Sequence, residues 1–183
     1  FYGAVILCID NEENRKILPQ IHRKVITYGL AEEADFRASP IQQKEFGSEF
    51  EVYHHEMKLG VVKLNVPGVH SIVNSLASIA VASELGVSFD TARQSLSTFR
   101  GVDRRFQLRA NVNDIMIIDD YAHHPSEIEA TLTAARQGWN RRVVAVFQPH
   151  RYSRSFHLFD GFTKCFEKAD VLILTDIYAA GEQ

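Results

Sequence analysis

The spacing of hydrophobic and polar residues divides the first third of the chain into short strands and one short helix. Residues 4–9 form an apolar run typical of a buried parallel strand, and residues 11–21 have the spacing of a short helix. Four short segments with alternating, β-branched or aromatic residues then follow: 24–29, 34–41, 48–55 and 58–65. Alternation with a period of two over such short segments predicts a small antiparallel meander.

The spacing becomes helical after residue 67. Apolar residues recur every three or four positions from Ile72 to Ala80, which predicts a helix that ends near Gly86. Ser88 has the position of an N-cap for a second helix. The residues of this second helix that we expect to face inward are Ala92, Leu96 and Phe99. The segment 99–106 then forms a candidate hinge.

After this hinge, strand-like and helical segments alternate. The expected elements are a hairpin over 106–119, helices over 125–137 and 155–168, and strands over 142–147 and 171–175. The βαβαβ order predicts a parallel sheet with right-handed crossovers, which ends after three parallel strands. The second of these helices should pack through one apolar face, formed by Phe156, Phe159, Phe162, Phe166 and Ala169. The predicted class is therefore α/β, with a second domain that is cut short.

Composition and charge narrow the class of protein without identifying it. The 183 residues are 45% hydrophobic and 23% charged, as in an ordinary globular protein, and the net charge of −3 includes no basic block. This argues against nucleic acid or an anionic membrane as the main partner. No apolar run approaches the ~20 residues that span a bilayer, and the N-terminal residues do not resemble a signal peptide. Cys8 and Cys165 have apolar surroundings, so we expect reduced core cysteines, which suit the cytoplasm.

A polar cluster, Asp-Asp-Tyr-Ala-His-His-Pro at 119–125, directly follows an apolar run. In open α/β sheets, ligands bind beyond the carboxyl ends of the strands, where this cluster should lie. Asp119 or Asp120 can accept hydrogen bonds from a ribose or help a metal site, or can simply end a strand in solvent. His123 and His124 adjoin a helix N-terminus, whose field favours neutral imidazole. A neutral histidine can orient an amine or accept its proton, although a surface cap is the alternative.

The segment Phe-Gln-Pro-His-Arg-Tyr-Ser-Arg at 147–154 occupies the equivalent place after the next strand. Arg151 and Arg154 are three residues apart at the start of a helix, so their guanidinium groups can converge on one anion. This arrangement predicts a site for a carboxylate or a phosphate. The alternative is two arginines that face the solvent.

Two more candidates lie outside these clusters. Arg105, in the hinge, could reach a phosphate when two domains close, or belong to a solvated turn. Asn74, near a helix start, could contact an adenine edge or act as a cap. The chain contains no Gly-x-x-x-x-Gly-Lys-[Ser/Thr] sequence, so it lacks a phosphate-cradling loop of its own.

Together, these motifs resemble the Mur ligase family. The matching segments are 66–70 with Asn74, 101–106, 119–125, 134–139, 147–154 and 178–182, while residues 1–65 match more weakly. In this family an N-terminal domain binds a UDP-sugar, a central domain carries the phosphate loop, and a Rossmann-like C-terminal domain receives the amino acid. The resemblance implies that residues 1–101 are the back part of the central ATP-binding domain. Residues 102–183 would be the front part of the C-terminal domain, with a truncated parallel sheet.

The resemblance also implies a reaction. ATP, with Mg²⁺, would activate the carboxylate of UDP-N-acetylmuramate as an acyl phosphate, which the amine of L-alanine would then attack. The main phosphate and metal ligands would lie in the missing N-terminal part, so this chain alone would be inactive. The resemblance implies that Asn74 contacts adenine, that Asp120 binds the ribose or helps to position the nucleotide, and that Arg105 reaches the ATP phosphates. Tyr121 and His123 would line the amino-acid pocket, and the alanine carboxylate would be held by His150, Arg151 and Arg154. Arg105 and His123 would be the catalytic residues.

One position departs from the family pattern, and two other functions stay open. The family usually has asparagine where this chain has the shorter Ser71. A related member that ligates the murein tripeptide shares the cluster at 119–125, although Arg151 and Arg154 suit a small free amino acid better. The missing phosphate loop would also suit a non-catalytic module that binds a nucleotide or an anion.

Overall fold

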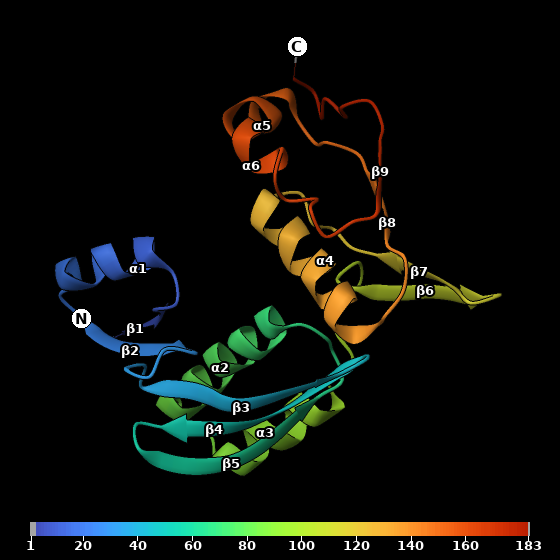
Figure 1. Ribbon diagram of the computed structural model, residues 1–183. Helices are drawn as coiled ribbons and strands as arrows, with labels where there is room; N and C mark the ends of the chain where they lie inside the picture. The colour runs from blue at the N-terminus through green and yellow to red at the C-terminus, as the bar shows by residue number, and fades with distance from the viewer. Residues whose placement is uncertain (1–2, 183) are drawn as a thin grey trace. The chain divides into compact units, whose positions relative to one another are not determined.

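The computed structural model describes residues 3–182, and of these every side chain except that of Lys44. The chain divides into two compact units, Phe1–Arg100 and Gly101–Gln183 (Figure 1). Both units combine helices with strands, which confirms the predicted α/β class. Within residues 3–182, no helix combines the length and the apolar character that a membrane span needs.

The described residues of the first unit form one mixed sheet of five strands in the order β1-β2-β3-β4-β5. The strands are β1 (Ala4–Cys8), β2 (Lys24–Gly29), β3 (Phe36–Lys44), β4 (Gly47–His54) and β5 (Met57–Leu64). The first three strands are parallel, and β3, β4 and β5 are antiparallel. The connection from β1 to β2 contains α1 (Glu12–Ile17) and the short 3₁₀ helix η1 (Leu18–Gln20).

The assignment of residues 24–29 to an antiparallel meander is wrong. In β2, Val25 pairs with Val5 of β1 in parallel, and Tyr28 pairs with Phe36 of β3 in parallel. The alternating pattern indicates which side chains of a strand are buried, and it carries no information about the direction of the neighbouring strand. Only the three later segments form the predicted meander.

Two helices, α2 (Val69–Glu84) and α3 (Phe89–Thr98), pack on this sheet and close the core of the first unit (Figure 1). The largest fully buried side chains are Phe50, Ile72, Leu76, Ile79, Val52 and Val62. As predicted, Ser88 caps α3: its Oγ accepts a hydrogen bond from Thr91 N at 3.2 Å. Phe99, expected to face inward, is instead 43% exposed, because the helix ends at Thr98 and Phe99 is extended.

The second unit begins with the antiparallel hairpin of β6 (Gln107–Val112) and β7 (Ile115–Asp119), followed by α4 (Pro125–Gly138). Strand β8 (Val144–Phe147) then pairs in parallel with β9 (Val171–Leu174). Among residues 3–182, β7 pairs with β6 alone, and β8 and β9 form a separate two-stranded sheet. Of the three strands expected in this parallel sheet, the described residues pair β8 with β9.

The prediction of a single helix over 155–168 is also wrong. It is replaced by α5 (Tyr152–His157) and α6 (Phe159–Phe162), which are separated at Leu158. Because this break changes the phase of the helix, Phe156 and Phe159 do not share the buried face and are 79% and 64% exposed. Phe162 and Phe166 do pack against the core formed by Ile128, Leu132 and Cys165.

Candidate functional site

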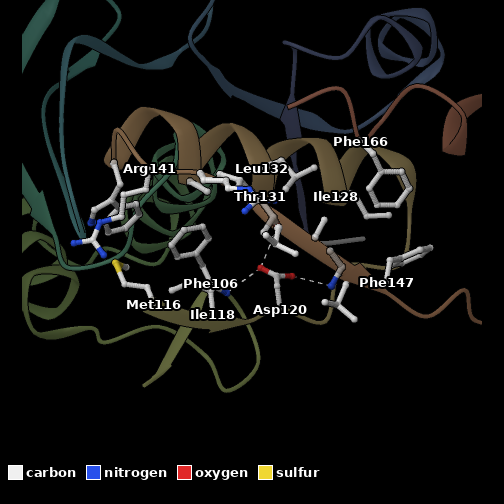
Figure 2. A pocket seen from close by; sticks show the side chains of 18 of the residues that line it. Phe106, Met116, Ile118, Asp120, Ile128, Thr131, Leu132, Arg141, Phe147 and Phe166 are labelled. Carbon is white, nitrogen blue, oxygen red and sulfur yellow. Dashed lines mark hydrogen bonds between the residues drawn. The ribbon is translucent and has the colours of Figure 1, made fainter. Parts of the chain in front are cut away.

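Asp120, directly after β7, ties three parts of the second unit together. Its Oδ2 accepts hydrogen bonds from Phe106 N at 2.9 Å and from Thr131 Oγ1 at 3.1 Å, and its Oδ1 accepts one from Ala122 N at 2.7 Å (Figure 2). These bonds join the end of the hinge segment, the segment after β7 and the middle of α4. The carboxylate thus fixes the backbone at Phe106 and at Ala122 within the 119–125 cluster, and it links both to α4. Its predicted contact with a ribose stays a prediction.

Glu127, in the first turn of α4, connects two of the predicted site residues. Its Oε2 accepts hydrogen bonds from His123 N at 2.9 Å and His124 N at 3.1 Å, while its Oε1 lies 3.4 Å from Arg105 Nη1. In the first turn of a helix, the charge of Glu127 suits the positive end of the helix dipole. Its position three residues after His124 is also the spacing of a capping box, which was the signal that could have revealed its hydrogen bond with His124 N.

The surroundings of Glu127 favour its charged form. Burial raises the pKa of this carboxyl, but the hydrogen bonds from the two histidine N–H groups and the nearby charges of His123 and Arg105 outweigh burial and lower the pKa. An ionised carboxylate therefore lies between the hinge arginine and the histidine pair at neutral pH.

His123 is held with one ring nitrogen toward the backbone. Its Nδ1 lies 2.9 Å from the carbonyl oxygen of Tyr121. Because a carbonyl oxygen can only accept, the neutral ring carries its proton on Nδ1, and Nε2 is left as the proton acceptor. The ring packs edge-on against Tyr121, with centroids 5.2 Å apart.

Tyr121 is itself positioned by the hinge segment. Its N–H donates to the carbonyl oxygen of Arg104 at 2.6 Å, and the Arg104 guanidinium lies over its ring, 4.8 Å from the centroid. The side chain of Tyr121 is 46% exposed, so the phenol is accessible beside the histidine. Arg105, through Glu127, and Tyr121, through its ring contact, therefore both lie near His123. Their predicted roles in ligand binding stay predictions.

The second cluster, at 150–154, is formed by a backbone turn and one arginine that folds back on it. Arg151 has a positive φ of 73°, and its N–H donates to the carbonyl oxygen of Tyr178 at 2.8 Å. Arg154 Nη1 donates to the carbonyl oxygen of His150 at 3.1 Å and lies 3.2 Å from His150 Nδ1. A guanidinium cannot accept a hydrogen bond, so His150 Nδ1 is the acceptor in the neutral ring.

A carboxylate of the chain itself occupies the first turn of α5. Glu182 accepts hydrogen bonds from Ser153 Oγ at 2.5 Å and from Ser153 N at 3.0 Å. These two hydrogen bonds, together with the charge of Arg151, lower the pKa of Glu182. The predicted carboxylate site at 151–154 therefore has its backbone donor at Ser153 already satisfied, which leaves the guanidinium groups as the binding elements. No motif in the sequence indicated this role of Glu182.

Asn74 lies in the first unit, whereas the other predicted site residues lie in the second. It is exposed on the second turn of α2, where its backbone carbonyl accepts a hydrogen bond from Ser78 Oγ at 3.3 Å. Ser71, which stands where the family usually has asparagine, donates from Oγ to the carbonyl oxygen of Pro67 at 2.8 Å. The hydroxyl of Ser71 thus stabilises the first turn of α2.

The described residues 3–182 contain no group of three or more histidine, cysteine, aspartate or glutamate side chains that could hold a metal ion. The two acidic side chains of the 119–125 cluster are engaged elsewhere. Asp119 Oδ2 accepts from Arg109 Nη2 at 2.8 Å, and Asp120 holds backbone N–H groups. The residues described here do not fit a resident Mg²⁺.

Two family models match the chain, and between them they leave out only residues 83–103. The model of the Mur ligase middle domain matches residues 1–82, and that of the Mur ligase glutamate ligase domain matches residues 104–183. The chain belongs to the Mur ligase family. Its two compact units are thus each similar to a part of a Mur ligase.

Individual Mur ligases show how much of such a protein this chain spans. It is 51% identical, over all 183 residues, to a UDP-N-acetylmuramate–L-alanine ligase from Geotalea daltonii, of which it covers 40%. The crystal structure of a UDP-N-acetylmuramate-alanine ligase from Thermotoga maritima is similar to this chain, with a TM-score of 0.73 and 31% identity. The likeness covers 86% of this chain and 35% of the Thermotoga maritima protein. The crystal structure of a murein peptide ligase from Psychrobacter arcticus is similar with a TM-score of 0.66 and 28% identity. The likeness covers 94% of this chain and 37% of that protein.

Proposed function

We propose that the full-length protein is an ATP-dependent ligase that joins L-alanine to the carboxylate of UDP-N-acetylmuramate in peptidoglycan synthesis. The observation that carries this proposal is the 51% identity, over the whole chain, to a ligase of that name. In the reaction, the carboxylate oxygen attacks the γ-phosphorus of ATP to give an acyl phosphate and ADP. The alanine amine then attacks the acyl carbon, loses a proton and displaces phosphate.

The cluster around Glu127 would serve the amine and the phosphoryl group. His123 has Nε2 as its proton acceptor and lies beside the accessible phenol of Tyr121, so the two side chains can line the pocket of the attacking amine. Arg105 carries a positive charge that can stabilise the negative charge of the phosphates. Its link to Glu127 brings this charge close to His123 before any substrate binds.

The cluster at 150–154 would hold the carboxylate of the amino acid. The guanidinium groups of Arg151 and Arg154 supply charged donors, and His150 keeps Arg154 in place. Charge-assisted hydrogen bonds of this kind are short and about twice as strong as neutral ones. Glu182 at Ser153 supports the turn from which both arginines extend.

The nucleotide would be bound by residues of this chain together with the rest of the protein. We assign adenine to Asn74, the ribose to Asp120 and the phosphates to Arg105. Because the sequence has no phosphate-cradling loop and the described residues do not fit Mg²⁺, the proposal assigns the main phosphate and metal ligands to the rest of the protein. Residues 1–101 would then be the back part of the central ATP-binding domain, and residues 102–183 the front part of the C-terminal amino-acid-binding domain. A reducing, cytoplasmic location fits the two free cysteines.

A second candidate is ligation of the murein tripeptide, which the likeness to the Psychrobacter arcticus ligase favours. A third is a module that binds a nucleotide or anion without catalysis. To distinguish them, the full-length protein would receive ATP, Mg²⁺, UDP-N-acetylmuramate labelled with ¹⁸O in its carboxylate, and equal concentrations of L-alanine and tripeptide. Mass spectrometry should find the alanine adduct and one labelled oxygen in the released phosphate. A tripeptide adduct would favour the second candidate, and nucleotide binding without any adduct would favour the third.

A further inference from the structure

The turn that carries the two arginines has a backbone conformation that few residues with a side chain adopt. Arg151 has φ 73° and ψ 137°, and a non-glycine residue at such a positive φ is strained. A strained residue keeps this conformation only where the surrounding contacts hold it. Because α5 begins at the next residue, Tyr152, the directions of Arg151 and Arg154 depend on the contacts that hold this turn.

Residues 178–182 hold the turn at two points. At the first, Tyr178 pairs with His150 as an isolated parallel bridge, and the Tyr178 carbonyl oxygen accepts a hydrogen bond from Arg151 N at 2.8 Å. The Tyr178 N–H also donates to the carbonyl oxygen of Pro149 at 2.9 Å. The rings of Tyr178 and His150 lie with their centroids 5.5 Å apart. These contacts fix the backbone that leads into the turn.

Glu182 supplies the second point, just after the strained residue. Its Oε2 accepts a hydrogen bond from Ser153 N at 3.0 Å and its Oε1 accepts one from Ser153 Oγ at 2.5 Å. Two hydrogen bonds to the backbone and the side chain of one residue fix both the position and the orientation of that residue. The bonds from Ser153, together with the charge of Arg151, hold the pKa of Glu182 below its ordinary value, so the carboxylate is ionised at neutral pH.

The position of Ser153 determines where the neighbouring Arg154 begins. The Arg154 guanidinium donates from Nη1 to the carbonyl oxygen of His150 at 3.1 Å, so the tip of this side chain is anchored before the turn. Its backbone lies after the turn, next to the residue that Glu182 holds. Guanidinium groups bind a carboxylate with geometric specificity, so two of them can share one carboxylate only when their spacing is maintained. Glu182 can therefore act on both arginines through the backbone.

We propose that Glu182 is a positioning residue for recognition of the amino-acid carboxylate. Through Ser153 it would hold the strained turn in the one conformation from which Arg151 and Arg154 converge on the carboxylate of the substrate. This inference rests on the proposed function, because it takes these arginines as the ligands of the amino acid. Glu182 itself would not bind the substrate, since two carboxylates repel each other.

The competing interpretation is that Glu182 occupies the place of the substrate carboxylate. Its removal would then free the arginines and strengthen binding of the amino acid. The contacts favour the positioning role, because both oxygens of Glu182 accept from Ser153, whereas Arg151 acts on Glu182 through its charge. The two interpretations predict opposite changes in the affinity for the amino acid, so one variant distinguishes them.

Steady-state kinetics of the full-length protein test the positioning role. Glu182→Ala should raise the KM for L-alanine about tenfold, with kcat and the KM for ATP changed less than about twofold, as expected when only binding of the amino acid is weakened. Glu182→Gln keeps one oxygen that can accept from Ser153, so its KM for L-alanine should lie between those of Glu182→Ala and the wild type. The control is Glu129→Ala, which removes an exposed carboxylate paired with Lys168.

A double-mutant cycle shows whether Glu182 acts through the arginines. In the background of Arg151→Ala, the further change Glu182→Ala should raise the KM for L-alanine by about threefold or less, because one of the groups that Glu182 positions is already gone. A general loss of structure would instead give the same factor in both backgrounds. It would also raise the KM for ATP.

Three results would overturn the proposal. The first is a KM for L-alanine that stays unchanged or falls in Glu182→Ala, and a fall would mean that Glu182 competes with the substrate. The second is an equal rise in the KM values for L-alanine and ATP. The third is full additivity in the double-mutant cycle. Failure of the proposed function is distinguishable from all three, because the wild type would then form no alanine adduct, and this assignment would be overturned with it.

Discussion

Arg105 and His123 are joined through the two oxygens of one carboxylate. Arg105 Nη1 lies 3.4 Å from Oε1 of Glu127, and His123 N donates to Oε2 at 2.9 Å. The two residues that we assign to catalysis thus approach each other without any ligand. Such positioning before binding lowers the cost of assembling a reactive geometry.

Removing the Glu127 carboxylate should therefore reduce catalysis. In the full-length protein, Glu127→Ala should lower kcat/KM by about 10²-fold, because misplacing reactive groups by about 1 Å has effects of that size. Glu127→Gln keeps an oxygen for the two histidine N–H groups, so its kcat/KM should lie between those of Glu127→Ala and the wild type. The matched control is Glu129→Ala, which removes an exposed carboxylate of the same helix that lies 3.4 Å from Lys168. Equal rates for the two alanine variants would contradict the positioning role.

The stability of the second unit should depend on pH through the same residue. The pKa of Glu127 in the folded chain lies below its ordinary value of 4.5, so the ionised carboxylate stabilises the folded state. This stabilisation is fully present at a pH above the pKa of Glu127 in the unfolded chain. It is lost as the pH falls through the pKa of Glu127 in the folded chain. The difference in Tm between the wild type and Glu127→Gln should therefore be constant near neutral pH and shrink below about pH 4.5. A difference in Tm that grows as the pH falls would contradict this prediction.

The arginine cluster should control affinity for the amino acid. Replacing Arg151 by alanine removes charge-assisted hydrogen bonds to a carboxylate, worth roughly 1.5–3 kcal/mol, so the KM for L-alanine should rise by about 10- to 100-fold. The KM for ATP should change little. Arg93→Ala, which removes an exposed arginine of α3 paired with Asp90, is the control for loss of charge. Steady-state kinetics in which Arg151→Ala raises both KM values equally would refute the carboxylate assignment.

The thiol of Cys165 should be unreactive in the folded chain. It is buried in the core of the second unit, and burial raises the pKa of its thiol to about 11. Because only the thiolate reacts, iodoacetamide at pH 8 should modify Cys165 only after unfolding. Mass spectrometry of the Cys8→Ser variant, with and without denaturant, isolates this thiol. Modification in the native chain at the rate of a free cysteine would show that the packing around Phe166 opens readily.

The sequence predicted local features well where one residue decides them. Ser88 was recognised as a cap, and Pro125 begins α4 as expected, because caps and prolines act on the adjacent backbone alone. The clusters at 119–125 and 147–154 were found because both follow apolar strands. Their assigned roles stay predictions.

Features that depend on distant partners were missed. Strand direction at residues 24–29 depends on the neighbouring strands, and the buried face of 155–168 depends on the break at Leu158. The contacts of Glu127 with Arg105 and of Glu182 with Ser153 span 22 and 29 residues, so no local spacing reveals them. Tertiary structure places these carboxylates where local sequence indicates only a helix end or a loop.

The measurement that tests the central claim most directly is phosphate release by the full-length protein. It would be given ATP, Mg²⁺ and UDP-N-acetylmuramate, with L-alanine, with the murein tripeptide, or with neither. The account predicts release that requires L-alanine and is strongly reduced by Glu127→Ala. Release that requires the tripeptide, or that proceeds equally without L-alanine, would contradict the assignment of residues 150–154 to the carboxylate of a free amino acid.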